Sequence, residues 1–188
     1  MIRALVLLSI LAFFGGCAPG LSSSLRVKPE GIELHDETSR VGSRAAGCIR
    51  IEQFLDQRKN AEIGLIDGRA LVADGSVIAS VERSVAKAFF AKSTGTDLCI
   101  PIQGELRDWI VVVTPEFPQS KIEGKCTLLL SVQPSEQSQG YRAIYTGNST
   151  RSHPFADRDL VERTLDEALE ECLKSAVNDD SMRRAVGW

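Results

Sequence analysis

The sequence has few of the side chains that carry catalysis. It contains two histidines, His35 and His153, in 188 residues. It lacks the G-x-S-x-G nucleophile elbow, the phosphate-binding P-loop and the G-x-G-x-x-G dinucleotide fingerprint. His35 falls in a predicted tether and His153 in a loop before Pro154, where solvated side chains are the simpler interpretation. The sequence therefore predicts no enzyme active site and no cofactor site.

The sequence also lacks an excess of positive charge. Lysine and arginine number 22 against 25 aspartate and glutamate residues, for a formal net charge of -3. Charges of both signs are interspersed along the chain, and no long run of either sign occurs. A nucleic-acid partner normally requires a basic patch or stripe, so this balance argues against nucleic acid.

A membrane-spanning run is absent as well. The uncharged run from Ala4 to Phe14 is shorter than the about 20 residues that a spanning helix needs. It follows Arg3 and ends at Gly15 and Gly16, which break a helix. A short positive start and a short apolar run are typical of a secretory signal peptide, predicted over residues 1–16.

The segment FGGC at residues 14–17 resembles the lipobox of bacterial lipoproteins, although Phe14 stands where leucine is commoner. The resemblance implies that Cys17 is acylated, which would anchor the chain without spanning the membrane. Residues 17–46 are predicted to be the lipidated cysteine and a flexible tether, rich in serine, glycine and proline. Ala18, rather than aspartate, follows the cysteine, which implies the outer membrane of a Gram-negative bacterium, at its periplasmic face.

Four further cysteines, Cys48, Cys99, Cys126 and Cys172, form an even set in an oxidising compartment, where two disulfides can form. Cys48 and Cys99 point away from the apolar faces of their predicted strands, whereas Cys126 and Cys172 fall on apolar faces. The favoured pairing is Cys48 with Cys99 and Cys126 with Cys172. Other pairings and buried free thiols remain open. No spacing has the C-x-x-C form, so a metal site is not predicted.

Hydrophobic periodicity predicts the elements of the remaining chain. Apolar stripes predict helices from Ser76 to about Lys92 and from Asp157 to about Asn178. Alternation of period two predicts strands over residues 47–56, 98–114, 121–133 and 141–150, the second bent or broken near Gly104. The segment 62–68 is predicted to be irregular.

The order of these elements is strand, helix, three strands, helix. It predicts a single α+β periplasmic domain over residues 47–188. The expected architecture is an antiparallel-rich sheet of about four strands, with two amphipathic helices packed on one face.

The stretch FLDQRKNAEIGLIDG carries a D-x-R-x(4)-I-G pattern in Asp56, Arg58, Ile63 and Gly64. This pattern, the amphipathic helix after it and the later YRAIYTG resemble the YajG-like lipoproteins of Gram-negative bacteria. The function of that family is poorly defined. The resemblance implies an outer-membrane lipoprotein that binds other envelope components.

Asp56 and Arg58 are candidate residues for a partner contact. At positions i and i+2 of a strand end, their side chains can form a bidentate ion pair. Such a pair either braces the following loop or contacts a partner, and the structural brace is the simpler interpretation.

Aromatic side chains are the other candidate for a partner contact. Tyr141 and Tyr145, with Trp109 and Phe117, could form an exposed patch for a protein or glycan. The alternative is ordinary packing between neighbouring strands.

Taken together, these features predict an outer-membrane-anchored lipoprotein that acts as a non-catalytic binding or accessory module in cell-envelope assembly or transport. Its expected partners are the membrane, through the lipid anchor, and an envelope protein or glycan. Two alternatives stay open: a periplasmic hydrolase with an unrecognised site, and a lipoprotein subunit of a motility or secretion apparatus.

Overall fold

The structure is a computed structural model that describes residues 24–25, 48–66, 69–73, 75–89, 99–134 and 140–188. The predicted signal peptide, Cys17 and most of the predicted tether lie outside the described residues. The elements are β1 (Ser24–Leu25), β2 (Ile49–Asp56), β3 (Glu62–Ile66), β4 (Arg69–Ala73), α1 (Val77–Ala88), β5 (Ile100–Glu116), β6 (Gln119–Val132), β7 (Tyr141–His153), α2 (Arg158–Val177) and α3 (Asp180–Ala185).

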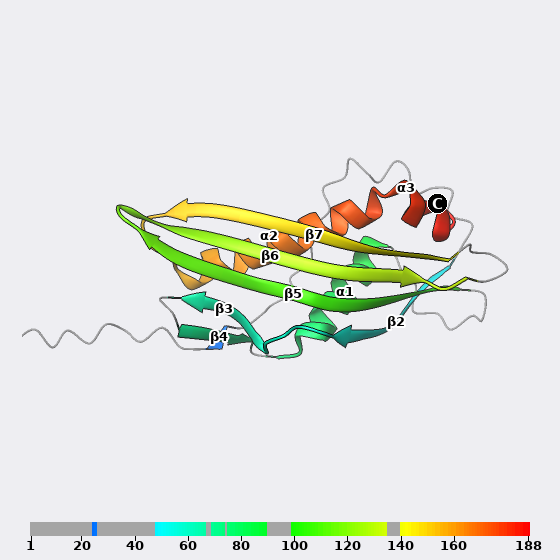
Figure 1. Cartoon of the computed structure of the whole chain (residues 1–188), viewed down its shortest axis with the longest axis horizontal. Coiled ribbons are helices and arrows are strands. Elements are labelled where there is room, and N and C mark those ends of the chain that lie inside the picture. The colour runs from blue at the N-terminus through cyan, green and yellow to red at the C-terminus, as the bar shows by residue number, and fades with distance from the viewer. Residues whose placement is uncertain (1–23, 26–47, 67–68, 74, 90–98, 135–139) are drawn as a thin grey trace, which may run out of the picture.

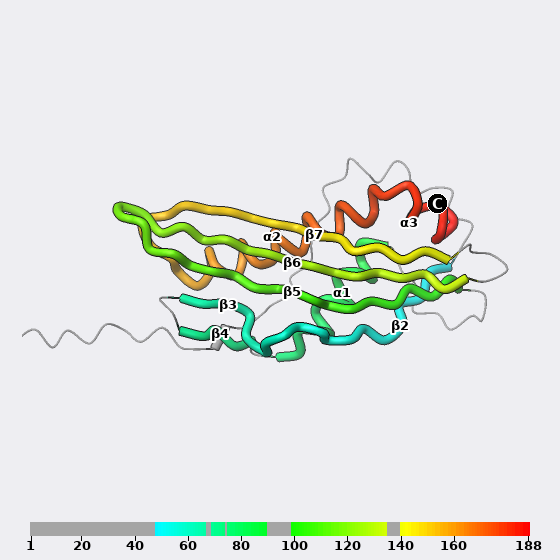
Figure 2. The backbone as a smooth tube through the Cα atoms, viewed as in Figure 1, coloured from blue at the N-terminus to red at the C-terminus, as the bar shows by residue number. Residues whose placement is uncertain are grey.

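The strands form one seven-stranded sheet in the order β1-β4-β3-β5-β6-β7, and β2 pairs with β5 beside β3. β2 and β3 follow one another along the same edge of β5, as the tube in Figure 2 shows. Long antiparallel pairings join β5 to β6 and β6 to β7. In Figure 1, α1 and α2 lie behind the sheet, on one face of it. The predicted α+β class and the placement of two helices on one face are confirmed.

The sheet is mixed, which corrects the predicted antiparallel-rich sheet of about four strands. β2 and β3 both run parallel to β5, and β1 runs parallel to β4. Parallel neighbours require a crossover connection. Here the chain between β2 and β5 passes through β3, β4 and α1, so β5 returns in the direction of β2. The strand β3 covers residues 62–66 of the segment 62–68, so the prediction that this segment is irregular is wrong there.

β5 is one strand of 17 residues, so the break predicted near Gly104 is not present. Gly104 is needed for packing: a Cβ atom there would lie 2.1 Å from the ring of Phe54 on β2. Pro101 is tolerated because Ile100 N donates toward β2, to Cys48 O at 2.7 Å, so the nitrogen of Pro101 faces the other edge, where pairing with β6 begins only at Ile102. The pairing with β2 is irregular between Ile51 and Phe54, opposite Ile102 to Gly104, and the pairing with β6 is irregular after Leu106, but the strand continues through both.

The core lies between the sheet and the helices. Alternate side chains of β5 and β6 point toward α2, and Trp109 is buried among them with its Nε1 donating to the carbonyl oxygen of Leu165 at 3.0 Å. No helix in the described ranges is long and apolar enough to cross a membrane.

Two glycines allow α2 to approach the sheet closely. A Cβ atom on Gly124 of β6 would lie 2.5 Å from the carbonyl oxygen of Thr164, and one on Gly147 of β7 would lie 2.1 Å from that of Ala168. These distances are far below van der Waals contact, so any larger residue would force the helix away. The helix backbone is therefore seated directly on the sheet.

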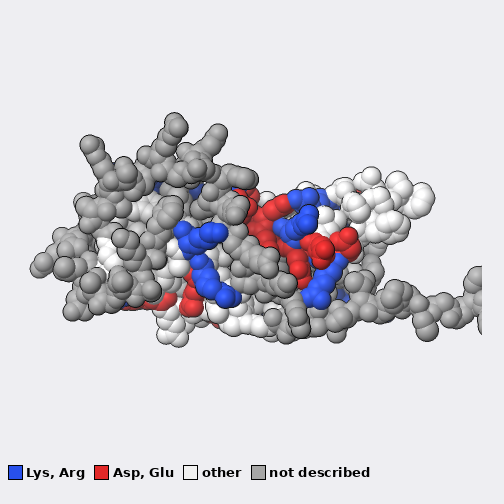
Figure 3. Space-filling model, turned by 180° about the vertical axis from the view of Figure 1, so that it is seen from behind, with Lys and Arg blue, Asp and Glu red and all other residues white. Residues whose placement is uncertain are grey.

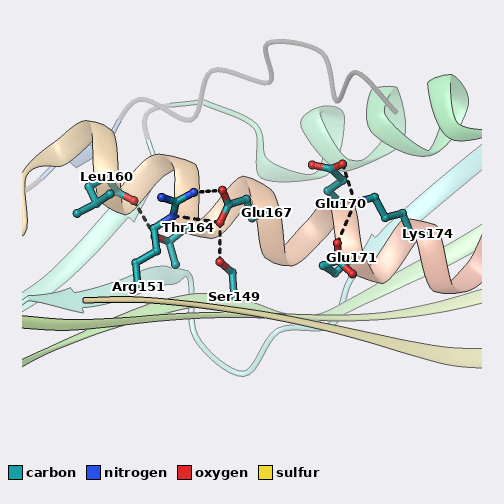
Figure 4. Close-up of polar contacts among 8 residues, drawn as sticks. All are labelled: Ser149, Arg151, Leu160, Thr164, Glu167, Glu170, Glu171 and Lys174. Carbon is teal, nitrogen blue, oxygen red and sulfur yellow. Dashed lines mark hydrogen bonds and ion pairs between the residues drawn. The ribbon is translucent and has the colours of Figure 1, made fainter. Parts of the chain in front are cut away.

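A polar cluster fixes α2 laterally on β7 (Figure 4). Ser149 Oγ donates to Glu167 Oε2 at 2.7 Å, and Arg151 Nε donates to the same oxygen at 3.1 Å. Arg151 Nη2 also contacts Glu167 Oε1. The hydrogen bond from Arg151 keeps the pKa of Glu167 below its usual value. The carboxylate thus stays ionised and holds helix and strand in register.

Candidate functional site

The face of the sheet opposite the helices is a candidate interaction surface, because no described element covers it (Figure 1). We call it the open face. It is defined by outward-pointing residues of β2, β5, β6 and β7, namely Glu52, Leu55, Gln103, Glu105, Arg107, Asp108, Lys125, Thr127, Leu129, Ser131, Arg142, Ile144, Thr146 and Asn148.

A row of four residues crosses the middle of the open face. The register aligns Leu55 with Glu105, Glu105 with Leu129, and Leu129 with Ile144. Leu129 is buried, whereas Leu55 is 47% exposed and Ile144 is 53% exposed. The row therefore presents apolar surface to solvent at both ends, with a carboxylate between them.

Glu105 is the centre of a charged cluster on this face. Its Oε2 accepts from Arg107 Nη2 at 3.3 Å, and its Oε1 accepts from Arg142 Nη2 at 3.2 Å. Both arginines remain more than a third exposed and have further N–H groups free to point outward. An acceptor group of a partner could bind them without breaking the cluster.

An amide and carboxylate network lies beside that cluster. Gln103 Nε2 donates to Glu52 Oε2 at 2.7 Å, and Gln133 Nε2 donates to Gln103 Oε1 at 3.2 Å. The hydrogen bond from Gln103, assisted by Arg50, lowers the pKa of Glu52, so this carboxylate is ionised at neutral pH. The network contains both donors and acceptors.

A shallow depression of about 570 Å³ lies where these two groups meet. It is lined by Gln103, Glu105, Ser131, Val132, Gln133, Pro134, Gly140, Tyr141 and Arg142. The lining mixes hydrogen-bonding side chains with apolar ones such as Val132 and Pro134, so the depression offers both polar and apolar surface to a ligand. Of these residues, sequence reasoning singled out only Tyr141. The only signal in the sequence was that every second residue of these strands is polar, and simple exposure to solvent also explains that pattern.

Asp56 and Arg58 form the predicted bidentate ion pair. Arg58 Nε donates to Asp56 Oδ1 at 2.9 Å, and Arg58 Nη2 donates to Asp56 Oδ2 at 2.8 Å. The backbone amide of Arg58 also donates to Asp56 Oδ1 at 3.2 Å, which fixes the turn after β2. These hydrogen bonds outweigh burial and lower the pKa of Asp56. A role of the pair in partner contact stays a prediction.

The expected exposed aromatic patch is wrong for Tyr145 and Trp109, which are buried on the helix side of the sheet. Tyr141 and Tyr145 donate their hydroxyl groups to Asp179 Oδ2 at 2.8 and 2.7 Å. Burial and the nearby Asp179 raise the pKa of Tyr145. Phe117 is fully exposed at the β5–β6 turn. The alternation along β7 shows which residues share a face, but it does not show which of the two faces the helices cover.

The Cys48–Cys99 disulfide is confirmed, with the two Cα atoms 4.4 Å apart. Cys126 and Cys172 are buried free thiols, so the predicted second disulfide is wrong. Both lie on core faces, as predicted, and their thiols interact. That interaction and burial raise the pKa of Cys126. The Cys172 thiol also contacts the carbonyl oxygen of Tyr145 at 3.3 Å. The prediction that both cysteines lie on core faces indicated that they are close together, but it did not show that they form a disulfide.

Within the part of the chain that the structure describes, no group of three or more His, Cys, Asp or Glu side chains could hold a metal ion. His153 is exposed, and its Nδ1 interacts with the backbone of Phe155.

No family model matches the chain, and no curated protein matches it. Among solved structures, the chain is similar to the crystal structure of protein XCC0632 from Xanthomonas campestris, family-model DUF330. The two share 12% sequence identity with a TM-score of 0.44, and the alignment covers 82% of this chain and 88% of that one. A similarity at this level identifies neither a family nor an activity.

The helix side of the molecule also carries charges of both signs (Figure 3). Seen from behind, acidic side chains gather in one area beside basic ones (Figure 3). Asp166 of α2 is half-buried. Burial, followed by the charges of Glu162 and Glu167, raises its pKa to about 7.

Asp166→Asn is expected to stabilise the fold at pH 8 by about 1–3 kcal/mol and to have little effect at pH 4. The folded pKa lies above the unfolded value of about 3.9, so the native state holds the proton more tightly. The contribution of Asp166 to the free energy of unfolding of the wild type therefore decreases as the pH rises from 4 to 7. Urea unfolding at the two pH values tests this. Asp159→Asn, at an exposed site on the same helix, is the matched control. A gain that does not grow with pH would contradict the prediction.

Proposed function

We propose that this chain is an outer-membrane-anchored lipoprotein that acts as a non-catalytic binding or accessory module in cell-envelope assembly or transport. The observation that carries the binding role is the open face, a broad hydrogen-bonding surface left uncovered by α1 and α2. The lipobox at residues 14–17 and the resemblance to the YajG-like lipoproteins support the location.

The composition of the open face favours an envelope protein or a glycan as the partner. Charges of both signs alternate and pair, as in Lys125 with Asp108 at 3.1 Å and Arg142 with Glu105 at 3.2 Å. Neutral hydroxyl and amide groups, such as Thr146 and Asn148, fill the space between them. A nucleic acid would require an unpaired basic surface. A polar partner with a small apolar contact at Ile144 fits this arrangement better.

Site-specific photo-crosslinking in the native host tests the binding role. A photoreactive residue at Thr146, on the open face, is expected to give a discrete product that saturates with expression level. Adding Ile144→Arg beside it should abolish that product. The matched control carries the photoreactive residue at Arg163, which is exposed on α2. Equal products from both positions, or none from Thr146, would contradict the proposal.

The anchor is tested by Cys17→Ser. We expect the variant to leave the outer-membrane fraction and become soluble, because a single unmodified serine offers no acyl chain for insertion. Incorporation of labelled palmitate into the wild type, and its loss in the variant, is the direct measurement. A wild-type chain that takes up no palmitate would refute the anchor and leave the crosslinking result unaffected.

A further inference from the structure

Two phenylalanines stand out among the apolar side chains on the surface of the described chain. Phe117 is 104% exposed and Phe155 is 78% exposed, whereas the other exposed large apolar side chains are between 36% and 53% exposed. Single exposed apolar side chains are ordinary in proteins, but several gathered at one place mark an interaction surface. The position of these two side chains relative to each other therefore decides what they indicate.

The strand pairing places both phenylalanines at the same end of the sheet. Phe117 lies in the turn between β5 and β6. Phe155 lies just beyond His153, the last residue of β7, which pairs with β6 close to that turn. We call this end of the sheet, residues 115–120 and 153–156, the tip; it is at the left in Figure 1. The two most exposed apolar side chains thus project from one small region.

The backbone that carries both rings is restrained locally. The pairing of β5 with β6 continues to the residues on either side of Phe117 and Pro118, so these two alone form the turn. His153 Nδ1 lies 2.7 Å from the carbonyl oxygen and 3.3 Å from the backbone nitrogen of Phe155. The fixed φ of Pro118 and of Pro154 restricts both loops further. The tip can therefore bind a surface with a small loss of conformational entropy.

The surroundings of the two rings are polar but not basic. The exposed neighbours include Glu116, Gln119 and Ser152. Lys121, the basic residue of β6 closest to the turn, pairs with Glu123 at 2.8 Å. Seen from behind, the same end of the molecule shows residues that carry no charge (right end of the described surface in Figure 3). These features favour insertion of apolar side chains over electrostatic attraction to anionic groups.

The predicted lipid anchor brings this end of the sheet toward a membrane. Cys17 precedes Ser24 by seven residues, which span at most about 25 Å when extended. β1 begins at Ser24 and runs parallel to β4, away from the tip. β4 pairs with β3, which pairs with Val111–Val113 in the half of β5 nearer the tip. An acylated Cys17 therefore holds the tip, rather than the end that carries α3, close to the bilayer (Figure 1).

We propose that the tip inserts Phe117 and Phe155 into the interfacial region of the phospholipid membrane. This role rests on the proposed lipid anchor, which supplies the proximity. The acyl chains keep the protein at the membrane, and the two rings fix its orientation, because a phenylalanine ring that leaves water needs no hydrogen-bond partner in the lipid. The open face then stands clear of the bilayer and stays accessible to a partner.

Fluorescence of the full acylated chain, reconstituted into vesicles of phosphatidylethanolamine and phosphatidylcholine, tests the insertion. An environment-sensitive fluorescent residue replaces Gln119 at the tip or Gln133 just beyond the opposite end of β6, and both side chains are exposed. We expect the emission at position 119 to shift to the blue and to be quenched by brominated lipids. The emission at position 133 should stay solvent-like. Added salt should not reduce the quenching, because the contact is apolar.

Phe117→Ser combined with Phe155→Ser removes both rings from exposed positions and should leave the fold intact. The quenching at position 119 is expected to be lost in this double variant. The matched control is Ile144→Ser, which removes an exposed apolar side chain from the open face and should leave the quenching unchanged.

The unacylated Cys17→Ser chain separates the tip from the anchor. Titrated with the same vesicles, it should still give a blue shift at position 119 at high lipid concentration. The double phenylalanine variant should need at least about tenfold more lipid for the same shift. A wild type without palmitate whose position 119 shifts in this titration would refute the anchor and support the tip.

The proposal is overturned if position 119 stays solvent-like with both chains, or if positions 119 and 133 are quenched equally. Quenching that survives the loss of both rings would also overturn it. A shift that occurs in native envelope membranes but not in protein-free vesicles would assign the tip to a protein partner instead.

Discussion

Removing the Cys48–Cys99 disulfide is expected to lower the free energy of unfolding by about 4 kcal/mol, by the chain-entropy estimate for a loop of this length. The bond closes a loop with a sequence separation of 51 residues, which contains β2, β3, β4 and α1. It joins the residue before β2 to the residue before β5, where the two strands begin to pair in parallel. Without it, the unfolded chain gains the entropy of the open loop.

The measurement is urea unfolding of the double variant Cys48→Ala, Cys99→Ala, which avoids unpaired thiols. Reductant should lower the stability of the wild type to that of the variant and have no effect on the variant itself. Because Cys126 and Cys172 are free and buried, they should react with a thiol reagent only after denaturation. A wild type whose stability is insensitive to reductant would contradict the predicted contribution.

Gly147→Ala is expected to destabilise the fold by about 3 kcal/mol. The added Cβ atom would lie 2.1 Å from the carbonyl oxygen of Ala168 and 2.4 Å from the backbone nitrogen of Cys172. Both atoms belong to the backbone of α2, so no side-chain rotation relieves the clash and the helix must move. That movement would disturb the core contacts along the whole helix.

The matched control is Asn148→Ala, one residue further along β7 and exposed on the open face, where we expect a change of about 0.5 kcal/mol or less. Urea unfolding of both variants provides the comparison. If Gly147→Ala were as stable as the control, α2 would not be seated on β7 as closely as the structure has it.

Local pattern was sufficient for the two longer helices and for the long antiparallel strands, but α3 was not predicted. The prediction for the first helix began at Ser76, and Ser76 is its cap; the second was predicted from Asp157, which caps α2. β6 matches its prediction closely because its alternation is clear over most of its length, with Leu129 as the apolar exception on the polar side. These features depend on interactions between residues that are close in sequence. The spacing of the apolar side chains is therefore enough to predict them.

Other features depend on residues far apart in the chain. Gly104 suggests a broken strand until Phe54 of β2 is placed beside it, and the ring then accounts for the glycine. The short strands β3 and β4 have no clear period of their own. The parallel direction of β2 and β3 follows from the crossover, which no local pattern contains.

The sequence by itself determined the secreted-lipoprotein prediction, the α+β class and both main helices, and it favoured Cys48 with Cys99 among open pairings, because each depends on local composition, spacing or face. Only the tertiary structure decided which side of the sheet is covered, and so which side chains can meet a partner. Tyr145 is buried and Ile144 exposed because α2 and α3 lie on one face of β7.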